Sequence, residues 1–374
     1  MKDYIGFGAL NEALEALGRE SHRKVLVVAS GSGWERFCAA GDRPFFAGRE
    51  VCLFKDFAPN PEFKEILAGA ERLRNFQPDI IIAIGGGSPM DVAKMMKAVV
   101  FTKEEYDAAK PESLKPSGEG PPLAAVATTS GSGSEATQFA VFYKDSVKQS
   151  LAHPSLRPDM AVVDPEMTYS LPPGQTAATG FDALSQAVES YWAGAATSES
   201  RELSRTAIGY IIPNLYNAVH APAPGNRYNM AQAAYLAGKA INTTRTTMPH
   251  ALCYHLTKRY GLPHGHATAI TLPYFFLLNT DPSLPVNSPL TLERNRENMN
   301  DLFAMLGQQS AEDAYVFWRN LMRACGLAST LSEVGVDDAD KMRALVSSMN
   351  MVRMKNHPVA IDSEYLVEYF LAHP

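Results

Sequence analysis

The 374-residue sequence predicts two domains, an α/β domain with a parallel sheet followed by an all-α domain. In the first part of the chain, apolar β-branched segments such as 24–29 and 80–84 alternate with helical patterns, which is typical of strands buried in a parallel sheet. The second part carries long helical patterns and no comparable strands. We place the boundary near 165–170 and assign the domains to 1–167 and 168–374.

The elements of each domain follow from hydrophobic periodicity and from turn residues. In the first domain, strands are expected at 24–29, 51–54, 80–84, 123–127, 145–150 and 160–163, and helices at 8–20, from Trp34 and at 62–76. A Pro/Gly-rich loop is expected at 110–122. In the second domain, helices are expected at 176–192, 198–219, 227–240, 248–260, 297–307, 310–325 and 362–371.

Composition excludes several classes of protein. The net charge is −6 and no long basic run occurs, which argues against a nucleic-acid partner. The four cysteines are far apart and form no CxxC motif, so reduced thiols in the cytoplasm are expected. The chain starts without an apolar signal segment, and no apolar run reaches the roughly 18 residues of a membrane span. The expected protein is soluble and cytoplasmic, with no membrane partner.

A glycine turn follows the segment 80–84. Gly85, Gly86 and Gly87 allow a sharp turn and close approach of the backbone to a ligand. Ser88 is expected to cap the next helix and Pro89 to occupy its first position. A strand, a glycine turn and a helix N-terminus together form an anion site. The alternative is a tight turn without a ligand.

A second loop of small residues follows the strand 123–127. Residues 128–135 read Thr-Thr-Ser-Gly-Ser-Gly-Ser-Glu and offer many donors to a phosphate or a ribose. The alternative is a flexible surface linker, which the position directly after an apolar strand disfavours.

Four residues of the second domain could hold a metal. Asp182 and Gln186 are four residues apart and so share one face of a helix, His250 starts a later helix, and His264 follows that helix in a turn. A carboxylate and two imidazoles suit Zn²⁺ or Fe²⁺, and an amide oxygen could add a contact. Taken singly, each residue has a structural explanation.

An arginine among threonines precedes His250. Arg245 is flanked by Thr243, Thr244, Thr246 and Thr247, and a guanidinium among hydroxyls suits an oxyanion or a phosphonate. The alternative is a solvated loop in which Thr247 caps the next helix.

These motifs together resemble the iron-containing (group III) alcohol dehydrogenases. The matching segments are Gly85–Ser88 with Asp91 and Lys94, 128–135, Asp164-Pro165, 171–173, 179–184, Pro249-His250-Ala251 and Pro263-His264-Gly265, within a match that runs from about residue 5 to 358. The resemblance implies the fold shared with dehydroquinate synthase, a small aldehyde or alcohol substrate, NAD or NADP, a divalent metal between the domains, and a homodimer.

The same resemblance implies roles for single residues. Asp182, His250 and His264 match the family's metal ligands, whereas Gln186 replaces a histidine, and Tyr254, followed by His255, replaces another. With Arg245 and the run 249–254, these departures resemble the phosphonoacetaldehyde reductases of phosphonate metabolism. Arg245 would then hold the phosphonate, and Tyr254 or His255 would relay the proton to the alcohol.

The cofactor is expected to lie on the loops of the first domain. The residues assigned to it are Ser30, Gly31, Gly85, Gly86, Gly87, Ser88, Asp91, Thr128, Thr129, Ser132 and Lys148. The family often has an acidic residue where Ser30 stands. Without that carboxylate a 2′-phosphate is not repelled, so NADP(H) is expected to be accepted or even preferred.

Two other classes of function stay open at this point. A lyase or cyclase of the dehydroquinate-synthase type shares this architecture and uses NAD only transiently. A non-catalytic nucleotide-binding relative would follow if Gln186 and Tyr254 marked a degenerate metal site.

Overall fold

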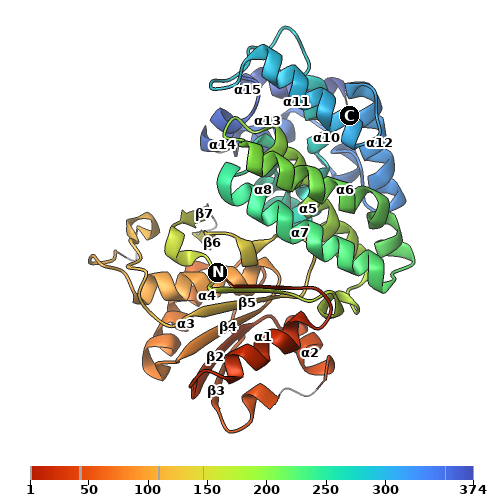
Figure 1. Ribbon diagram of the computed structural model, residues 1–374. Helices are drawn as coiled ribbons and strands as arrows, with labels where there is room; N and C mark the ends of the chain where they lie inside the picture. Colours follow the sequence, from red (N-terminus) through yellow and green to blue (C-terminus); the bar gives the residue numbers. More distant parts are fainter. Residues whose placement is uncertain (1, 42–43, 108–109, 146, 350, 374) are drawn as a thin grey trace. The chain divides into compact units, whose positions relative to one another are not determined.

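The computed structural model describes residues 2–41, 44–107, 110–145, 147–349 and 351–373. It divides into two compact units, Met1–Ser170 and Leu171–Pro374. The first runs from red to yellow-green in Figure 1 and the second from green to blue. An α/β unit with a parallel sheet and a helical unit are present, which confirms the predicted fold class.

The first unit is built on a six-stranded parallel sheet. Its strands are β1 (Lys2–Ile5), β2 (Lys24–Ala29), β3 (Glu50–Phe54), β4 (Ile80–Gly85), β5 (Leu123–Ala127) and β8 (Met160–Val163). They lie in the order β1-β8-β5-β4-β2-β3. The central strands β4 and β5 are buried along their whole length, as expected for strands covered on both faces.

Helices cover both faces of this sheet (Figure 1). They are α1 (Ala9–Gly18), α2 (Gly31–Ala39), α3 (Phe63–Phe76) and α4 (Gly87–Val100), with short 3₁₀ turns at Pro44–Phe46, Pro111–Ser113, Ser134–Ala136, Pro154–Leu156 and Pro165–Thr168. Leu10 and Phe37, of α1 and α2, pack with Ile82 on one face. Ile66 and Met96, of α3 and α4, pack into a second core on the other face.

The predicted strand at 145–150 is wrong at its start. Asp145 has a φ of 51° and lies in a turn. This turn joins β6 (Phe139–Lys144) to β7 (Val147–Ala152), an antiparallel hairpin outside the main sheet. Neither β6 nor the edge strand β1 is predicted from the sequence; β1 has only four residues, two of them charged.

Two predicted helix starts are also wrong. Helix α2 begins at Gly31, not at Trp34, because the Ser30 hydroxyl accepts a hydrogen bond from the Gly33 N–H at 3.1 Å and caps the helix. Helix α4 is capped at Gly86, not at Ser88. Ser88 and Pro89 therefore lie inside the first turn, where a missing N–H costs no intrahelical bond.

The second unit is helical throughout. Its helices are α5 (Pro173–Trp192), α6 (Ser198–His220), α7 (Pro224–Thr244), α8 (Met248–Tyr260), α9 (His264–Ala269), α10 (Leu272–Leu278), α11 (Leu292–Met305), α12 (Ala311–Ala324), α13 (Ala339–Ser347), α14 (Met351–Asn356) and α15 (Ser363–Ala372), with one 3₁₀ turn at Ser332–Val334. None of the helices in the described part of the chain is long and apolar enough to cross a membrane.

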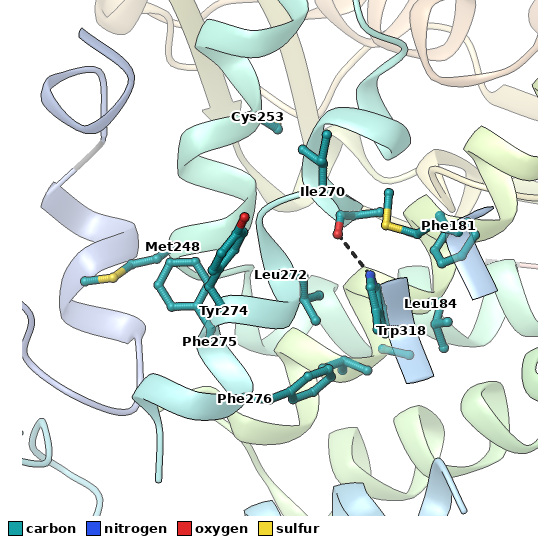
Figure 2. Close-up of a cluster of buried hydrophobic side chains, with 14 of the residues drawn as sticks. Phe181, Leu184, Met248, Cys253, Ile270, Leu272, Tyr274, Phe275, Phe276 and Trp318 are labelled. Carbon is teal, nitrogen blue, oxygen red and sulfur yellow. Dashed lines mark hydrogen bonds between the residues drawn. The ribbon is translucent and has the colours of Figure 1, made fainter. Parts of the chain in front are cut away.

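Aromatic rings build the core of this unit (Figure 2). Trp318 contacts Phe181 and Phe276 edge to face, with ring centroids 5.6 and 5.8 Å apart. Its indole N–H donates to the Ala269 carbonyl at 2.9 Å, so the one polar atom of this side chain is paired. The core thereby joins α5, α10 and α12.

Four helices of this unit are absent from the sequence-based prediction: α9, α10, α13 and α14. Each is short, so its periodicity is weak. His264 was expected in a turn and instead begins α9, after Pro263. Helix α11 begins at Leu292, several residues before the predicted start, because Thr291 caps it and charged residues fill its first turns.

Helix α9 packs directly against α5 through a glycine. A Cβ built on Gly265 would lie 2.0 Å from the Ala178 carbonyl oxygen and 2.6 Å from the Asp182 Cβ. Backbone of one helix therefore contacts backbone of the other, and any side chain at this position would force the helices apart.

The variant Gly265→Ala should lower the free energy of unfolding by about 1–3 kcal/mol, because overpacking at a backbone contact cannot be relieved by a rotamer change. Thermal and chemical denaturation measure this loss. Gly209→Ala is the matched control, because no atom lies within 4 Å of its added Cβ in α6. A helical Gly→Ala change of this kind should gain about 0.5–1 kcal/mol. Equal stabilities of the two variants would contradict the packing assigned to Gly265.

Candidate functional site

Three loops of the first unit meet at the carboxyl edge of its sheet. Strands β2, β4 and β5 are neighbours, and each is followed by one of the loops that contain Ser30, Gly85–Gly87 and Thr128–Ser132. The strand order reverses between β2 and β4, since β3 lies on the other side of β2. Such a switch point is where open α/β sheets bind ligands.

Glycines allow these loops to approach closely. A Cβ on Gly86 would lie 3.1 Å from the Thr129 hydroxyl, and one on Gly87 would lie 3.4 Å from that of Ser132. Gly85 has a φ of 150°, and its added Cβ would lie 3.1 Å from the Ser30 hydroxyl. The structure thus brings these predicted cofactor residues together.

The turn ends at the N-terminus of α4, a 14-residue helix whose cap residue, Gly86, provides no side-chain acceptor. The backbone N–H groups of the first turn therefore point toward the loops without a side-chain cap, as an anion site requires. The Thr128 N–H donates to the Gly85 carbonyl at 2.9 Å and fixes the neighbouring loop. Ser88 accepts from the Asn60 N–H at 3.3 Å, and Gly31 is an exposed residue of the first turn of α2.

A cluster of polar residues, Asp91, Lys94 and Ser134, supports these loops. The Lys94 ammonium is buried and donates to the Ser134 carbonyl at 2.7 Å and to the Phe139 carbonyl at 2.9 Å. Asp91 accepts from the Ser134 hydroxyl at 3.2 Å. Burial raises the pKa of Asp91, an effect that Lys94 and Lys148 oppose. Lys148, predicted to touch the cofactor, therefore lies near Asp91.

Asp182, His250 and His264 come together in the second unit. They lie on α5, α8 and α9, and one ligand atom from each is within 4.8 Å of the others. Nε2 of His250 is 3.5 Å from Oδ1 of Asp182, and both atoms are buried without a hydrogen-bond partner among the described residues. Two lone-pair atoms directed at one point fit a cation between them, so the donor set suits a divalent metal.

The sequence-based reasoning missed Glu189, which orients His250. Its fully buried carboxylate accepts a short hydrogen bond from Nδ1–H of His250. This bond fixes the tautomer, so Nε2 carries the lone pair that faces Asp182. Glu189 lies seven residues after Asp182 and three after Gln186, so the helical period could have found it.

Burial and charge act in opposite directions at these residues. Burial alone would raise the pKa of Asp182, but the neighbouring imidazoles of His250 and His264, with a hydrogen bond from Gln186, lower it. Burial would lower the pKa of His250, but Glu189 and Asp182 raise it. Gln186, predicted as a fourth ligand, is buried and contacts the Asp182 carboxylate.

Tyr254 contacts the cluster and His255 lies elsewhere. The Tyr254 ring is nearly parallel to that of His264, with centroids 6.3 Å apart. The neighbouring His255 projects about 100° away around the helix. It contacts Tyr260 at 6.0 Å, and burial, with the charge of Arg259, lowers its pKa.

Arg245 ends α7 with an exposed side chain and an unusual backbone, with a φ of 61° and a ψ of −174°. The threonines around it are mostly buried. The Thr244 and Ser190 hydroxyls share a hydrogen bond at 2.9 Å, and the Thr247 hydroxyl donates to Glu189 at 2.9 Å. Thr246 accepts from Arg353, a residue that the sequence-based reasoning did not single out. The threonine hydroxyls thus fix the chain around Arg245 instead of surrounding an anion with it.

Comparison with known proteins identifies the family. Residues 2–165 match the model for iron-containing alcohol dehydrogenase, and 176–372 match the model for the C-terminal part of the Fe-containing alcohol dehydrogenase family. The chain is 34% identical over 288 residues to the NADPH-dependent butanol dehydrogenase of Clostridium saccharobutylicum, which covers 75% of this chain and 73% of that protein. It is 33% identical over 309 residues to the 1,3-propanediol dehydrogenase of Klebsiella pneumoniae, which covers 79% and 76%.

Solved structures show the same relationship. A sulfoacetaldehyde reductase from Bifidobacterium kashiwanohense in complex with NAD⁺ superposes with a TM-score of 0.86 at 26% identity, over 100% of this chain and 98% of that one. Enzymes of this family use NAD(P) and a divalent metal, which agrees with the glycine cradle and with the Asp182–His250–His264 cluster. The chain therefore belongs to the iron-containing alcohol dehydrogenase family and is an oxidoreductase that acts on CH–OH groups.

Proposed function

We propose that this enzyme uses NAD(P)H to reduce a small aldehyde that bears a phosphonate group, such as phosphonoacetaldehyde, to its primary alcohol. The observation that carries the proposal is that a metal-binding cluster and arginines lie in one region of the helical unit. Tyr254 contacts the proposed metal ligand His264 and also the guanidinium of Arg353. A homodimer is the expected assembly.

Asp182, His250 and His264 would hold the metal, which would supply Lewis acidity toward the aldehyde oxygen. Glu189 keeps His250 in the tautomer whose Nε2 can bind a cation. We assign Gln186 to the orientation of Asp182, because its side chain hydrogen-bonds that carboxylate. In this assignment, a neutral residue takes the position where the family usually has a histidine, and it still fixes the carboxylate of Asp182.

Tyr254 is the better placed of the two proposed proton donors. Its ring contacts that of His264, whereas His255 contacts Tyr260. A tyrosine hydroxyl can pass a proton to a nascent alkoxide when it lies within hydrogen-bond reach of it. We therefore assign the proton relay to Tyr254.

Arg245 is held in a conformation that its sequence disfavours. A positive φ is uncommon for arginine and costs about 1–3 kcal/mol, so surrounding bonds must impose it. The Arg245 carbonyl accepts from the Thr244 hydroxyl at 2.7 Å. Asn356 donates to the carbonyls of Thr244 at 2.9 Å and Thr246 at 3.1 Å. Strain that is imposed in this way supports a role in positioning substrate.

We assign the cofactor to the three loops of the first unit, with its pyrophosphate at Gly85–Ser88. Thr128, Thr129 and Ser132 would contact the phosphates or the ribose, and Asp91 and Lys148 would support them. Ser30 caps α2 with its hydroxyl, and no carboxylate occupies its place. This absence supports acceptance of NADP(H).

An oxidation assay with NADPH and NADH tests the proposal. The metal-loaded enzyme should oxidise NADPH in the presence of phosphonoacetaldehyde and small neutral aldehydes, and removal of the metal by a chelator should abolish turnover. A strong kinetic preference for NADH would contradict the cofactor assignment. A lyase or cyclase would show no net NAD(P)H consumption, and a non-catalytic relative would bind nucleotide without turnover.

The variant Glu189→Gln should weaken metal binding by about 10- to 100-fold, because loss of the carboxylate releases His250 from its tautomer. Competition with a fluorescent chelator measures the affinity directly. Glu202→Gln is the matched control, because Glu202 is exposed on α6. If the two variants bound metal equally well and remained folded, Glu189 would have no role in orienting the site.

The variant Arg245→Ala should raise KM by about 10- to 100-fold for phosphonoacetaldehyde and change it little for a neutral aldehyde, since a charge-assisted hydrogen bond is lost. Alanine has the same Cβ as arginine, so the backbone strain at this position stays and only the guanidinium is removed. Arg296→Ala, on the exposed face of α11, is the control. Equal effects on both aldehydes would refute the role of Arg245.

A further inference from the structure

A second arginine lies close to the metal cluster in the helical unit. Arg353 belongs to α14 and is partly buried. Its guanidinium carbon is 5.1 Å from the centroid of the Tyr254 ring, and Nη1 donates a short hydrogen bond to the Thr246 hydroxyl. Thr246 directly follows Arg245, so Arg353 contacts both Tyr254 and the neighbour of the strained Arg245.

Only one aromatic ring separates Arg353 from a metal-binding residue. Tyr254 is 6.3 Å from His264 between ring centroids, and the two rings are inclined by only 10°. Tyr254 therefore links the Arg353 guanidinium to the edge of the candidate metal site.

The backbone around both arginines is fixed by one residue. Asn356, at the end of α14, donates to the carbonyls on either side of Arg245, those of Thr244 and Thr246. The Asn356 carbonyl accepts from the Gly194 N–H at 2.8 Å, which anchors α14 to the end of α5. Arg245 and Arg353 therefore emerge from one hydrogen-bonded frame, which preorganises their positions.

The contacts that Arg353 makes leave its guanidinium able to bind an anion. A guanidinium has five N–H donors, and the bond to Thr246 uses one of them. A cation–π contact is not a hydrogen bond, so Tyr254 orients the group without consuming a donor. Two guanidiniums in one frame match the several oxygens of a tetrahedral oxyanion.

We propose that Arg353 acts with Arg245 as a two-guanidinium subsite for the tetrahedral oxyanion of the aldehyde substrate, either a phosphonate or a sulfonate. Arg353 is then a specificity-determining residue. This inference rests on the proposed reduction of a small aldehyde and adds the second half of the site that recognises its charge.

The test compares three aldehydes with the metal-loaded enzyme: phosphonoacetaldehyde, sulfoacetaldehyde and 3,3-dimethylbutanal. The last replaces the oxyanion by a neutral, equally branched group. Arg353→Met should lower kcat/KM by about 10- to 100-fold for the anionic aldehydes and leave that for the neutral one little changed. Arg353→Lys, which keeps the charge and loses the planar fork, should lie between the two.

Arg343→Met is the matched control, because Arg343 is an exposed residue of α13 that pairs with Glu364. A loss of stability in α14 would lower turnover of all three aldehydes, whereas loss of the subsite lowers only that of the anionic ones. An unchanged ratio of anionic to neutral turnover in Arg353→Met would overturn the inference. The ratio of phosphonate to sulfonate turnover identifies the source of the oxyanion.

Failure of the proposed function is distinguishable from failure of the subsite. If no aldehyde, including the neutral one, supports NAD(P)H oxidation, the proposed function is wrong. Calorimetric titration with methylphosphonate then still decides the subsite. Tighter binding to the unsubstituted enzyme than to Arg353→Met supports it, and equal binding overturns it.

Discussion

The buried carboxylate of Glu189 is the constraint on which the helical unit's site depends. One oxygen accepts from the N–H and hydroxyl of Thr247, each at 2.9 Å, and the other accepts from the ring of His250. A charge that is fully removed from water is stable only when several donors surround it. These donors all come from the start of α8, so the carboxylate caps that helix, holds its first imidazole and ties it to α5 at the same time.

The two units build their candidate sites by different physical means. In the first unit, backbone does the work, because glycines bring three loops into contact and leave helix N–H groups for an anion. In the second unit, side chains on three helices converge, and each needs a neighbour to fix its direction. A glycine also matters within the second unit, since the absence of a side chain at Gly265 lets His264 approach Asp182.

The sequence predicts what local patterns determine. The strands β2, β5 and β8 have the predicted bounds, and Asp182, His250 and His264 converge as their chemistry suggested. Edge strand β1 escaped prediction because it is short and pairs with β8, far along the chain, whereas β6 was missed although its partner β7 follows directly. The position of Glu189 could have been inferred from the helical period, but its contact with His250 could not. Arg353 could not be predicted, because its proposed role depends on contacts with Thr246 and Tyr254, which lie about a hundred residues earlier in the chain.

Asn356 lies 110 residues after Thr246 in the chain, which has a consequence for synthesis. A chain that leaves the ribosome from its N-terminus presents all three residues of the metal cluster well before α14 emerges. Until then the carbonyls on both sides of Arg245 lack their amide donor. The Asp182–His250–His264 cluster can thus assemble on the nascent chain before α14 is made, and the backbone frame around Arg245 closes only once Asn356 has been added.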